Sequence, residues 1–167
     1  MNNSFIFDDE INLKKVRRAI GYFKEWYGLK LSENLGTLKF YNGMGSYFST
    51  AEDMLKWEHS LTTERLVNAL TLEQIFTRGK LNDGSAVYYN CGWELYRYKG
   101  VEYMIHAGGW AGFKSFIIRF PEQHFATIVL SNSGQLDISG LSLALIKIYL
   151  ADEISVQIGR ASCRERV

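Results

Sequence analysis

"VEYMIHAGGWAGFKSFIIRF", residues 101–120, is the stretch that decides the fold of this chain. Apolar and polar residues alternate on both sides of its glycines, through Val101–Ala107 and again through Phe113–Phe120. A period of two is typical of β-strands that bury one face. Glycine is the residue that most readily allows a tight turn. We therefore expect two consecutive strands, with the GGWAG segment (108–112) lying between them.

The same period continues beyond this stretch in both directions. The segments CGWELYRY (91–98) and FATIVLSN (125–132) predict two further strands. The connections are a two-residue hairpin at Lys99-Gly100 and a tight turn at Pro121–His124. The segment ISGLSLALIKIYLA (138–151) is almost wholly hydrophobic, as expected of a helix that lies on a sheet. The prediction is an antiparallel meander with a terminal helix on one face.

Helical patterns precede these strands. The segment STAEDMLKWEHSL (49–61) opens with a capping box in two alternative registers, Ser49 with Glu52 or Thr50 with Asp53. Behind the cap, its apolar residues recur at helical spacing.

A second helical pattern, TERLVNALTLEQIF (63–76), follows the first. Regularly spaced glycines and aromatic residues between Ala19 and Tyr47 predict short extended segments and turns. The predicted fold class is therefore α+β, an antiparallel sheet with a C-terminal helix packed on it and part of a helical lobe before it.

Composition places the chain among globular proteins. Its 167 residues are 47% hydrophobic and 14% aromatic, which suits one domain with a packed core. The formal net charge is +1, so we expect neither a nucleic-acid surface nor a polybasic membrane patch. No apolar run approaches the length of a membrane segment, and MNNSFIFDDE (1–10) lacks the pattern of a signal peptide.

The last ten residues, IGRASCRERV (158–167), differ from the rest of the chain in having no hydrophobic period and a sudden cluster of arginines. They are the in-frame translation of a DNA string that resembles the adapter of short-read sequencing libraries. We therefore expect a native segment over 1–157 and a read-through tail over 158–167. Without the tail the formal net charge changes from +1 to −1. Cys91 is then the only cysteine, which excludes an intramolecular disulfide.

Of the three histidines, His106 is the candidate for chemistry. His59 lies in a predicted helix and His124 in a predicted turn, and neither has a partner at metal-ligand spacing, so no metal site is expected. The chain has no Gly-x-Ser-x-Gly motif, and GGWAG does not open a helix, which excludes an α/β-hydrolase elbow and a dinucleotide loop. His106 ends an apolar strand and precedes Ala107-Gly108-Gly109. These small residues form either a plain turn or an open edge whose N–H groups can stabilise an oxyanion, and the local sequence alone favours the turn.

Several segments, taken in order, resemble a known family. They are MNNSFIFDD (1–9), RRAIGY (17–22), GMGSYFSTAEDMLKW (43–57), LNDGSAVYYNCGWEL (81–95) and IHAGGWAGFKSFIIRFPEQHFATIVLSN (105–132). As a set they resemble the serine β-lactamase and penicillin-binding-protein-like superfamily over Met1–Ala151, in particular the β-lactamase-related serine hydrolases. That group includes class C β-lactamases, D-aminopeptidases, DD-carboxypeptidases and esterases. The resemblance implies the C-terminal part of the β-lactamase/transpeptidase-like fold.

The resemblance also implies the roles of site residues. The family's third motif, Lys-Thr-Gly or His-x-Gly, lines the active site and corresponds to His106-Ala107-Gly108, and the oxyanion-hole amide that follows corresponds to Gly109. His106, Gly108 and Gly109 are thus the implied catalytic residues, while His106, Ala107 and Trp110 are the implied substrate contacts. Histidine in place of lysine favours esterase or peptidase chemistry over that of a class C lactamase. The implied partner is a small-molecule or peptide substrate, with no cofactor and no metal.

Two family motifs are missing from the chain. No serine is followed three residues later by lysine, the Ser-x-x-Lys arrangement that activates the family's nucleophile. The family's second motif, Tyr-x-Asn or Ser-x-Asn, should precede the segment at Met1. Ser32-Glu33-Asn34 and Tyr88-Tyr89-Asn90 match its letters but come after that segment, so they stand at the wrong place in the order. We therefore expect the C-terminal fragment of a serine hydrolase that acts on an ester, amide or β-lactam through an acyl-enzyme, the fragment itself being inactive. The alternative is a non-catalytic binding or scaffold domain of the same fold.

A fragment of this kind implies an incomplete core. An apolar face left open by the missing half favours self-association. Family members are often periplasmic or secreted, and a signal peptide of the parent would precede Met1, which we expect to be an internal methionine.

Overall fold

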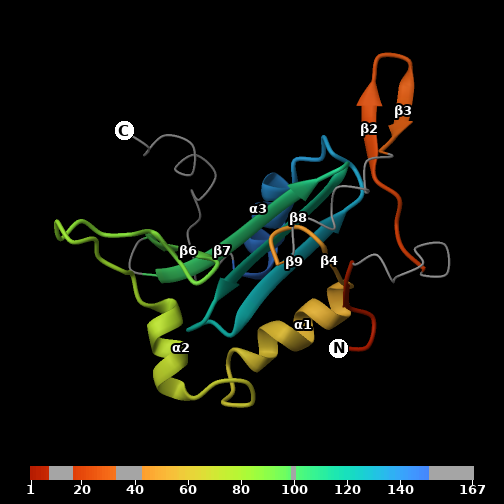
Figure 1. Cartoon of the computed structure of the whole chain (residues 1–167). Helices are drawn as coiled ribbons and strands as arrows, with labels where there is room; N and C mark the ends of the chain where they lie inside the picture. The colour runs from red at the N-terminus through yellow and green to blue at the C-terminus, as the bar shows by residue number, and fades with distance from the viewer. Residues whose placement is uncertain (8–16, 33–42, 99–100, 151–167) are drawn as a thin grey trace.

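A five-stranded antiparallel sheet forms the body of the protein (Figure 1). The computed structural model describes residues 1–7, 17–32, 43–98 and 101–150. The strands lie in the sheet in the order in which they occur in the chain. They are β5 (Tyr89–Asn90), β6 (Trp93–Tyr98), β7 (Val101–Trp110), β8 (Phe113–Phe120) and β9 (Phe125–Ser131). The predicted meander is confirmed, and β5 adds a short strand at one edge.

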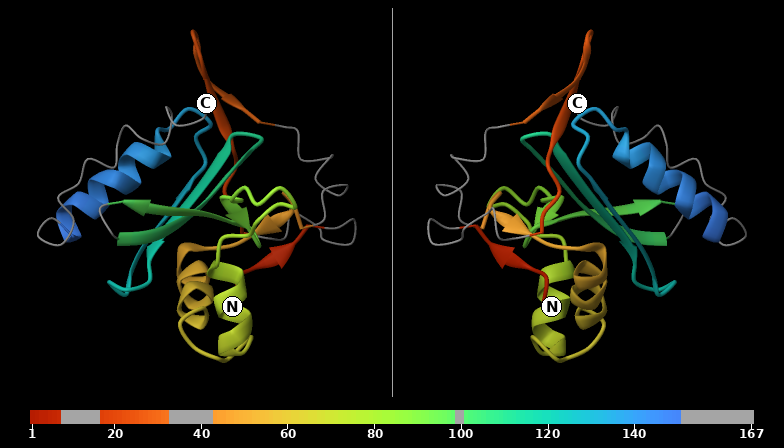
Figure 2. Two further views of the ribbon diagram at one scale, coloured as in Figure 1. Left: turned by 90° about the vertical axis from the view of Figure 1, so that its left-hand side faces the viewer. Right: turned by 90° about the vertical axis from the view of Figure 1, so that its right-hand side faces the viewer.

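Helices cover both faces of this sheet (Figure 2). They are α1 (Ala51–Ser60), α2 (Ala69–Phe76) and α3 (Ile138–Tyr149). Because neighbouring side chains of a strand point to opposite faces, β8 contributes to two cores. Ile118 packs with Ile146 of α3, whereas Ile117 shares the opposite core with Trp93 and Trp57. The rings of Trp57 and Trp93 stack with centroids 5.6 Å apart, which fastens α1 to the sheet.

Two small antiparallel sheets lie beside the main one. They are formed by β1 (Phe5–Ile6) with β4 (Tyr47–Phe48) and by β2 (Tyr22–Glu25) with β3 (Gly28–Leu31). The β2–β3 hairpin projects from the body, and Trp26 at its tip is 94% exposed (Figure 1). Its base is anchored by two backbone bonds, from Tyr22 N–H to the Asn132 carbonyl (2.8 Å) and from Gly134 N–H to the Tyr22 carbonyl (2.9 Å).

The prediction for the GGWAG segment is wrong in its boundaries. β7 continues to Trp110, so Gly108 and Gly109 belong to the strand, and only Ala111 and Gly112 form the turn. Glycine has a low preference for strands, but the ladder of hydrogen bonds to β8 outweighs that preference here. Of the two alternatives left open by the sequence, a plain turn is therefore excluded for Ala107, Gly108 and Gly109, which form the end of a strand.

The helix starts are set by polar caps. α1 begins after Thr50, whose side chain accepts the N–H of Asp53 at 3.2 Å, so the helix starts at the cap residue of the second predicted register. The Asp53 side chain bonds elsewhere, so the predicted capping box forms only in this one direction. α2 begins later than predicted, because the side chain of Asn68 caps it by accepting the N–H of Thr71 at 2.9 Å. Residues 63–67, predicted as helix, instead form turns and bends that lead to the cap residue.

The turn at Pro121–His124 is confirmed, since Phe120 pairs with Phe125 across it. The predicted hairpin at Lys99-Gly100 and the predicted boundary between 157 and 158 lie outside the described residues. None of the helices in the described ranges is long and apolar enough to cross a membrane.

Within the described residues, the surface of α3 that faces away from the sheet carries exposed apolar side chains. Ile148 is 72% exposed and Tyr149 is 70% exposed, while Ile138, Ser142 and Ile146 face the sheet. An apolar surface of this kind on a helix that is already packed on its other side is suited to a further contact.

Candidate functional site

The end of β7 extends beyond its neighbour β6. The last pair between these strands joins Ile105 to Glu94, while the pairing with β8 continues to the end of β7, where Trp110 lies opposite Phe113. From His106 onward, β7 therefore has a strand partner on one side only, within the part of the chain that the structure describes. We call residues Ala107–Trp110 the open edge.

The turn that follows the open edge fixes which of its backbone groups are available. Ala111 and Gly112 have φ angles of 48° and 79°, the left-handed pair of a type I′ turn. In such a two-residue hairpin the flanking residues, Trp110 and Phe113, exchange both of their backbone hydrogen bonds. Hydrogen-bonding direction alternates along a strand, so Gly108 also bonds to β8. The N–H and C=O groups of Ala107 and Gly109 consequently lie along the side of β7 that β6 leaves open.

His106 lies at the start of the open edge with its ring held by a backbone carbonyl. Its Nδ1 lies 2.5 Å from the carbonyl oxygen of Gly92. A carbonyl can only accept, so Nδ1 carries the proton and donates it to Gly92. Nε2 of the exposed ring then has a lone pair in the neutral form and a proton in the charged form.

Ser115 was not singled out by the sequence and lies beside this histidine. It pairs with Gly108, and a Cβ placed on Gly108 would come within 2.7 Å of its hydroxyl oxygen. His106, Gly108 and Ser115 share the sheet face that α1 and α2 cover, because His106 lies opposite Ile117 of that core. The two-residue turn could have identified Ser115 from the sequence, because it fixes the register of the hairpin and so places Ser115 opposite Gly108.

A cluster of aromatic residues supports the turn beyond the open edge. Phe7 is buried against Phe48, Ala111 and Phe113. The rings of Phe48 and Phe113 meet edge to face with centroids 6.4 Å apart. On another side, a Cβ on Gly21 would lie 2.2 Å from the Ala111 carbonyl oxygen, so the chain before β2 can pass this turn only with glycine there. These contacts hold the end of β7 in place.

A buried ion pair lies deeper between the sheet and α1. Arg119 is 2% exposed, and its Nε donates to Glu58 Oε1 at 3.2 Å. Its guanidinium also lies 4.6 Å from the ring centroid of Phe76. Burial lowers the pKa of Arg119, and the charge and hydrogen bond of Glu58 oppose that shift. Since Arg119 pairs with Met104 and not with a residue of the open edge, this ion pair joins the layers and is not part of the candidate site.

The structure brings the predicted site residues together on one segment. His106, Ala107, Gly108, Gly109 and Trp110 are consecutive and exposed at the end of β7. They present different groups, because Ala107 and Gly109 direct backbone groups away from β8 while His106 presents its ring. The other two histidines lie elsewhere, as predicted, with His59 exposed on α1 and His124 exposed in the turn after β8.

This antiparallel sheet between helices has the β-lactamase fold of penicillin-binding-protein-like structures. The family model described as Beta-lactamase matches residues 11–144, and the chain belongs to this family.

Solved structures and a curated relative support this assignment. The octameric penicillin-binding protein homologue from Pyrococcus abyssi superposes with a TM-score of 0.73 at 22% identity, covering 90% of this chain and 34% of that one. The penicillin binding protein from Bacillus halodurans gives a TM-score of 0.60 at 20% identity, covering 85% of this chain and 44% of that one.

Penicillin-binding protein 4* of Bacillus subtilis (strain 168) is 29% identical over 95 residues, which are 56% of this chain and 21% of that protein. The chain thus spans about a fifth of this curated relative and less than half of each solved structure.

Proposed function

We propose that this chain is the third-motif portion of a serine hydrolase that acts through an acyl-enzyme on an ester, amide or β-lactam. The observation that carries the proposal is the open edge of β7, where the N–H of Gly109 has no strand beside it in the described part of the chain. A backbone N–H at such a place is the kind of donor that stabilises a tetrahedral oxyanion. Membership of the Beta-lactamase family supports the same chemistry.

The chemistry assigns a step to each group. A serine hydroxyl, supplied by sequence outside these residues, attacks the substrate carbonyl carbon and gives its proton to a neighbouring base. The carbonyl oxygen takes up the negative charge and accepts the N–H of Gly109. The bond from the carbonyl carbon to the leaving oxygen or nitrogen then breaks, and the base returns its proton to that atom, which in a β-lactam stays attached to the acyl group. Water later cleaves the acyl ester. Losing one oxyanion donor slows such a reaction on the order of 10²- to 10³-fold.

Substrate is held along the same edge. The N–H and C=O groups of Ala107 are spaced two residues from those of Gly109, as an extended peptide or acyl chain requires to lie beside a strand. His106 orients polar groups of the substrate through Nε2, since Nδ1 is committed to Gly92. Trp110, 40% exposed, adds an aromatic surface at the far end.

We further propose that the 167-residue chain alone does not hydrolyse substrates by this route, because none of its serines has a lysine three residues later. The test is incubation with a fluorophosphonate and with a fluorescent penicillin. No serine should become labelled, and labelling of any serine would overturn this part of the proposal. Upstream genomic sequence gives a second test, since an in-frame Ser-x-x-Lys followed by Tyr-x-Asn is expected there.

The second candidate function is a non-catalytic binding or scaffold domain of the same fold. It is favoured by the same missing motif, and it requires a complete upstream reading frame that lacks both motifs. A monodisperse 167-residue monomer that unfolds cooperatively would support it.

Self-association is the remaining proposal about partners. The homologue from Pyrococcus abyssi is octameric. Here the open apolar surface of α3, with Ile148 and Tyr149 exposed, is the surface that we propose for contacts between copies.

A further inference from the structure

We propose that Asp53 is a positioning residue of the candidate site. Its carboxylate holds Asn3 and Ser4 of the N-terminal segment against α1, and we call these hydrogen bonds the clamp. The proposal rests on the proposed function only in naming the open edge as the site. Asp53 is the third residue of α1 and has no exposed surface. A buried carboxylate must be fully hydrogen-bonded to be tolerated, so its partners show what it does.

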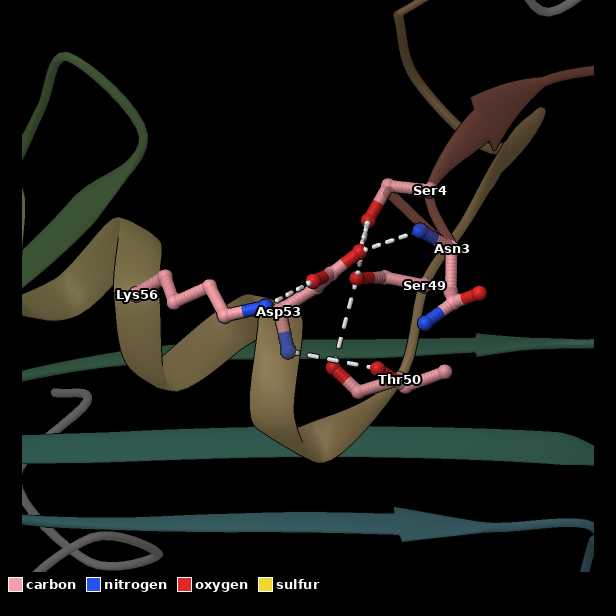
Figure 3. A network of polar contacts seen from close by, with 6 residues as sticks. All are labelled: Asn3, Ser4, Ser49, Thr50, Asp53 and Lys56. Atoms are coloured by element: carbon pink, nitrogen blue, oxygen red, sulfur yellow. Dashed lines mark hydrogen bonds and ion pairs between the residues drawn. The ribbon is translucent and has the colours of Figure 1, made fainter. Parts of the chain in front are cut away.

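Its partners come from two segments that are about 50 residues apart in the chain (Figure 3). Oδ2 accepts the backbone N–H of Asn3 at 2.7 Å and the hydroxyl of Ser4 at 2.9 Å. Oδ1 accepts Lys56 Nζ at 3.1 Å. Burial raises the pKa of Asp53, but the bonds from Asn3, Lys56 and Ser4 outweigh burial and hold that pKa well below its ordinary value.

These partners differ from those of an ordinary capping box. In a capping box the third residue of the helix would return its side chain to the N–H of the cap residue. Here Thr50 does accept the N–H of Asp53, but the Asp53 carboxylate turns to Asn3 and Ser4 instead. Ser49 adds a contact from its hydroxyl to that of Ser4 at 2.8 Å. The carboxylate therefore joins the N-terminal segment to α1 in addition to any effect on the helix itself.

The clamp is connected to the open edge by contiguous packing. Directly after Ser4, β1 pairs with β4, and the N–H of Phe7 donates to the carbonyl of Ser46 at 2.7 Å. Phe7 and Phe48 then pack on Phe113, which is the partner of Trp110 across the turn. Asp53 thus fixes β1, and β1 with β4 fixes the turn that ends the open edge.

The test uses amide NMR of the ¹⁵N-labelled 167-residue chain without substrate. Asp53→Ala is compared with Glu52→Ala, which removes an exposed carboxylate one residue away on the same helix. In Asp53→Ala we expect the Phe7 amide to exchange at least tenfold faster and the Gly109 and Trp110 amide peaks to move. The amide of Ile118 in the sheet centre should keep its exchange rate, and Glu52→Ala should leave all of these unchanged.

Movement of the Gly109 peak with an unchanged Ile118 separates positioning from a general loss of stability. Faster exchange at Phe7 with an unmoved Gly109 peak would overturn the proposal, and so would no change at Phe7. If Asp53→Ala does not fold, Ser4→Ala removes one donor from the other side of the clamp and must move the Gly109 peak, or the proposal fails. Because no substrate is present, failure of the proposed hydrolase function would leave these results as they are.

Discussion

Proline substitutions at Gly108 and Gly109 test which amides of β7 face its open edge. Proline has no N–H, so it removes a ladder bond only where that N–H is bonded. The N–H of Gly108 bonds to β8, and its loss leaves the Ser115 carbonyl unpaired. We expect Gly108→Pro to lower the free energy of unfolding by about 2–4 kcal/mol, the lost bond plus an unpaired acceptor. Gly109→Pro removes no ladder bond and should change it by less than about 1 kcal/mol.

Alanine variants separate the missing N–H from side-chain crowding. A Cβ on Gly108 would lie 2.7 Å from the Ser115 hydroxyl, whereas one on Gly109 would have its nearest neighbour, the Phe113 carbonyl oxygen, at 3.7 Å. At each position, the loss of unfolding free energy measured for the alanine variant is therefore subtracted from the loss measured for the proline variant. The assay is urea unfolding followed by tryptophan fluorescence. Equal remaining costs at the two positions, or a larger cost at Gly109, would refute the assignment of the open edge.

Three further outcomes follow from the same structure. Glu58→Ala leaves the buried Arg119 without its partner and should cost about 3–5 kcal/mol in urea unfolding, with a smaller loss for Glu58→Gln; losses below 1 kcal/mol for both would contradict the ion pair's role. Folding lowers the pKa of Asp53, so the stabilisation from its ionised form is present above the ordinary carboxyl pKa and is lost as pH falls below it. In Asp53→Asn the free energy of unfolding should therefore fall less steeply as the pH is lowered into the acid range. The same pH dependence in Asp53→Asn and the unchanged protein would argue against the clamp. Ile148→Asp should reduce self-association in sedimentation velocity while the exposed control Lys147→Ser does not, and equal sedimentation of the two variants would rule out the α3 surface.

Much of the fold could be predicted because its signals are local. The period of two in residues 91–132 and the almost continuous apolar pattern of 138–151 each depend only on neighbours in the chain. The two ends of β7 show where local reasoning fails. Its first residues alternate and were predicted as strand, whereas Gly108 and Gly109 carry no strand preference of their own and are held by pairing with β8.

The candidate site divides in the same way. His106 and the glycines after it could be selected from the sequence, because a family motif and small residues coincide there. Their hydrogen-bonding directions could not be predicted, since they follow from the turn at Ala111-Gly112. The contact of Asp53 with Asn3 and Ser4 joins segments far apart in the chain, and no local pattern encodes it.

The start of α2 at Ala69 cannot be predicted from hydrophobic spacing. Leu66, Val67 and Leu70 have helical spacing, which predicts a helix on both sides of Asn68. The side chain of Asn68 caps the first turn of α2, so the helix begins only after this residue. Leu66 and Leu70 are accordingly exposed and not part of the core.

The central claim is that the Gly109 amide at the open edge of β7 stabilises the oxyanion of an acylation reaction. The most direct measurement uses a longer protein in which a Ser-x-x-Lys motif precedes these residues. The rate of its acylation by a fluorescent penicillin is compared between Gly109→Pro and Gly109→Ala. We expect acylation of the proline variant to be slower on the order of 10²-fold or more, because it alone lacks the N–H. Equal acylation rates for the two variants would contradict the claim.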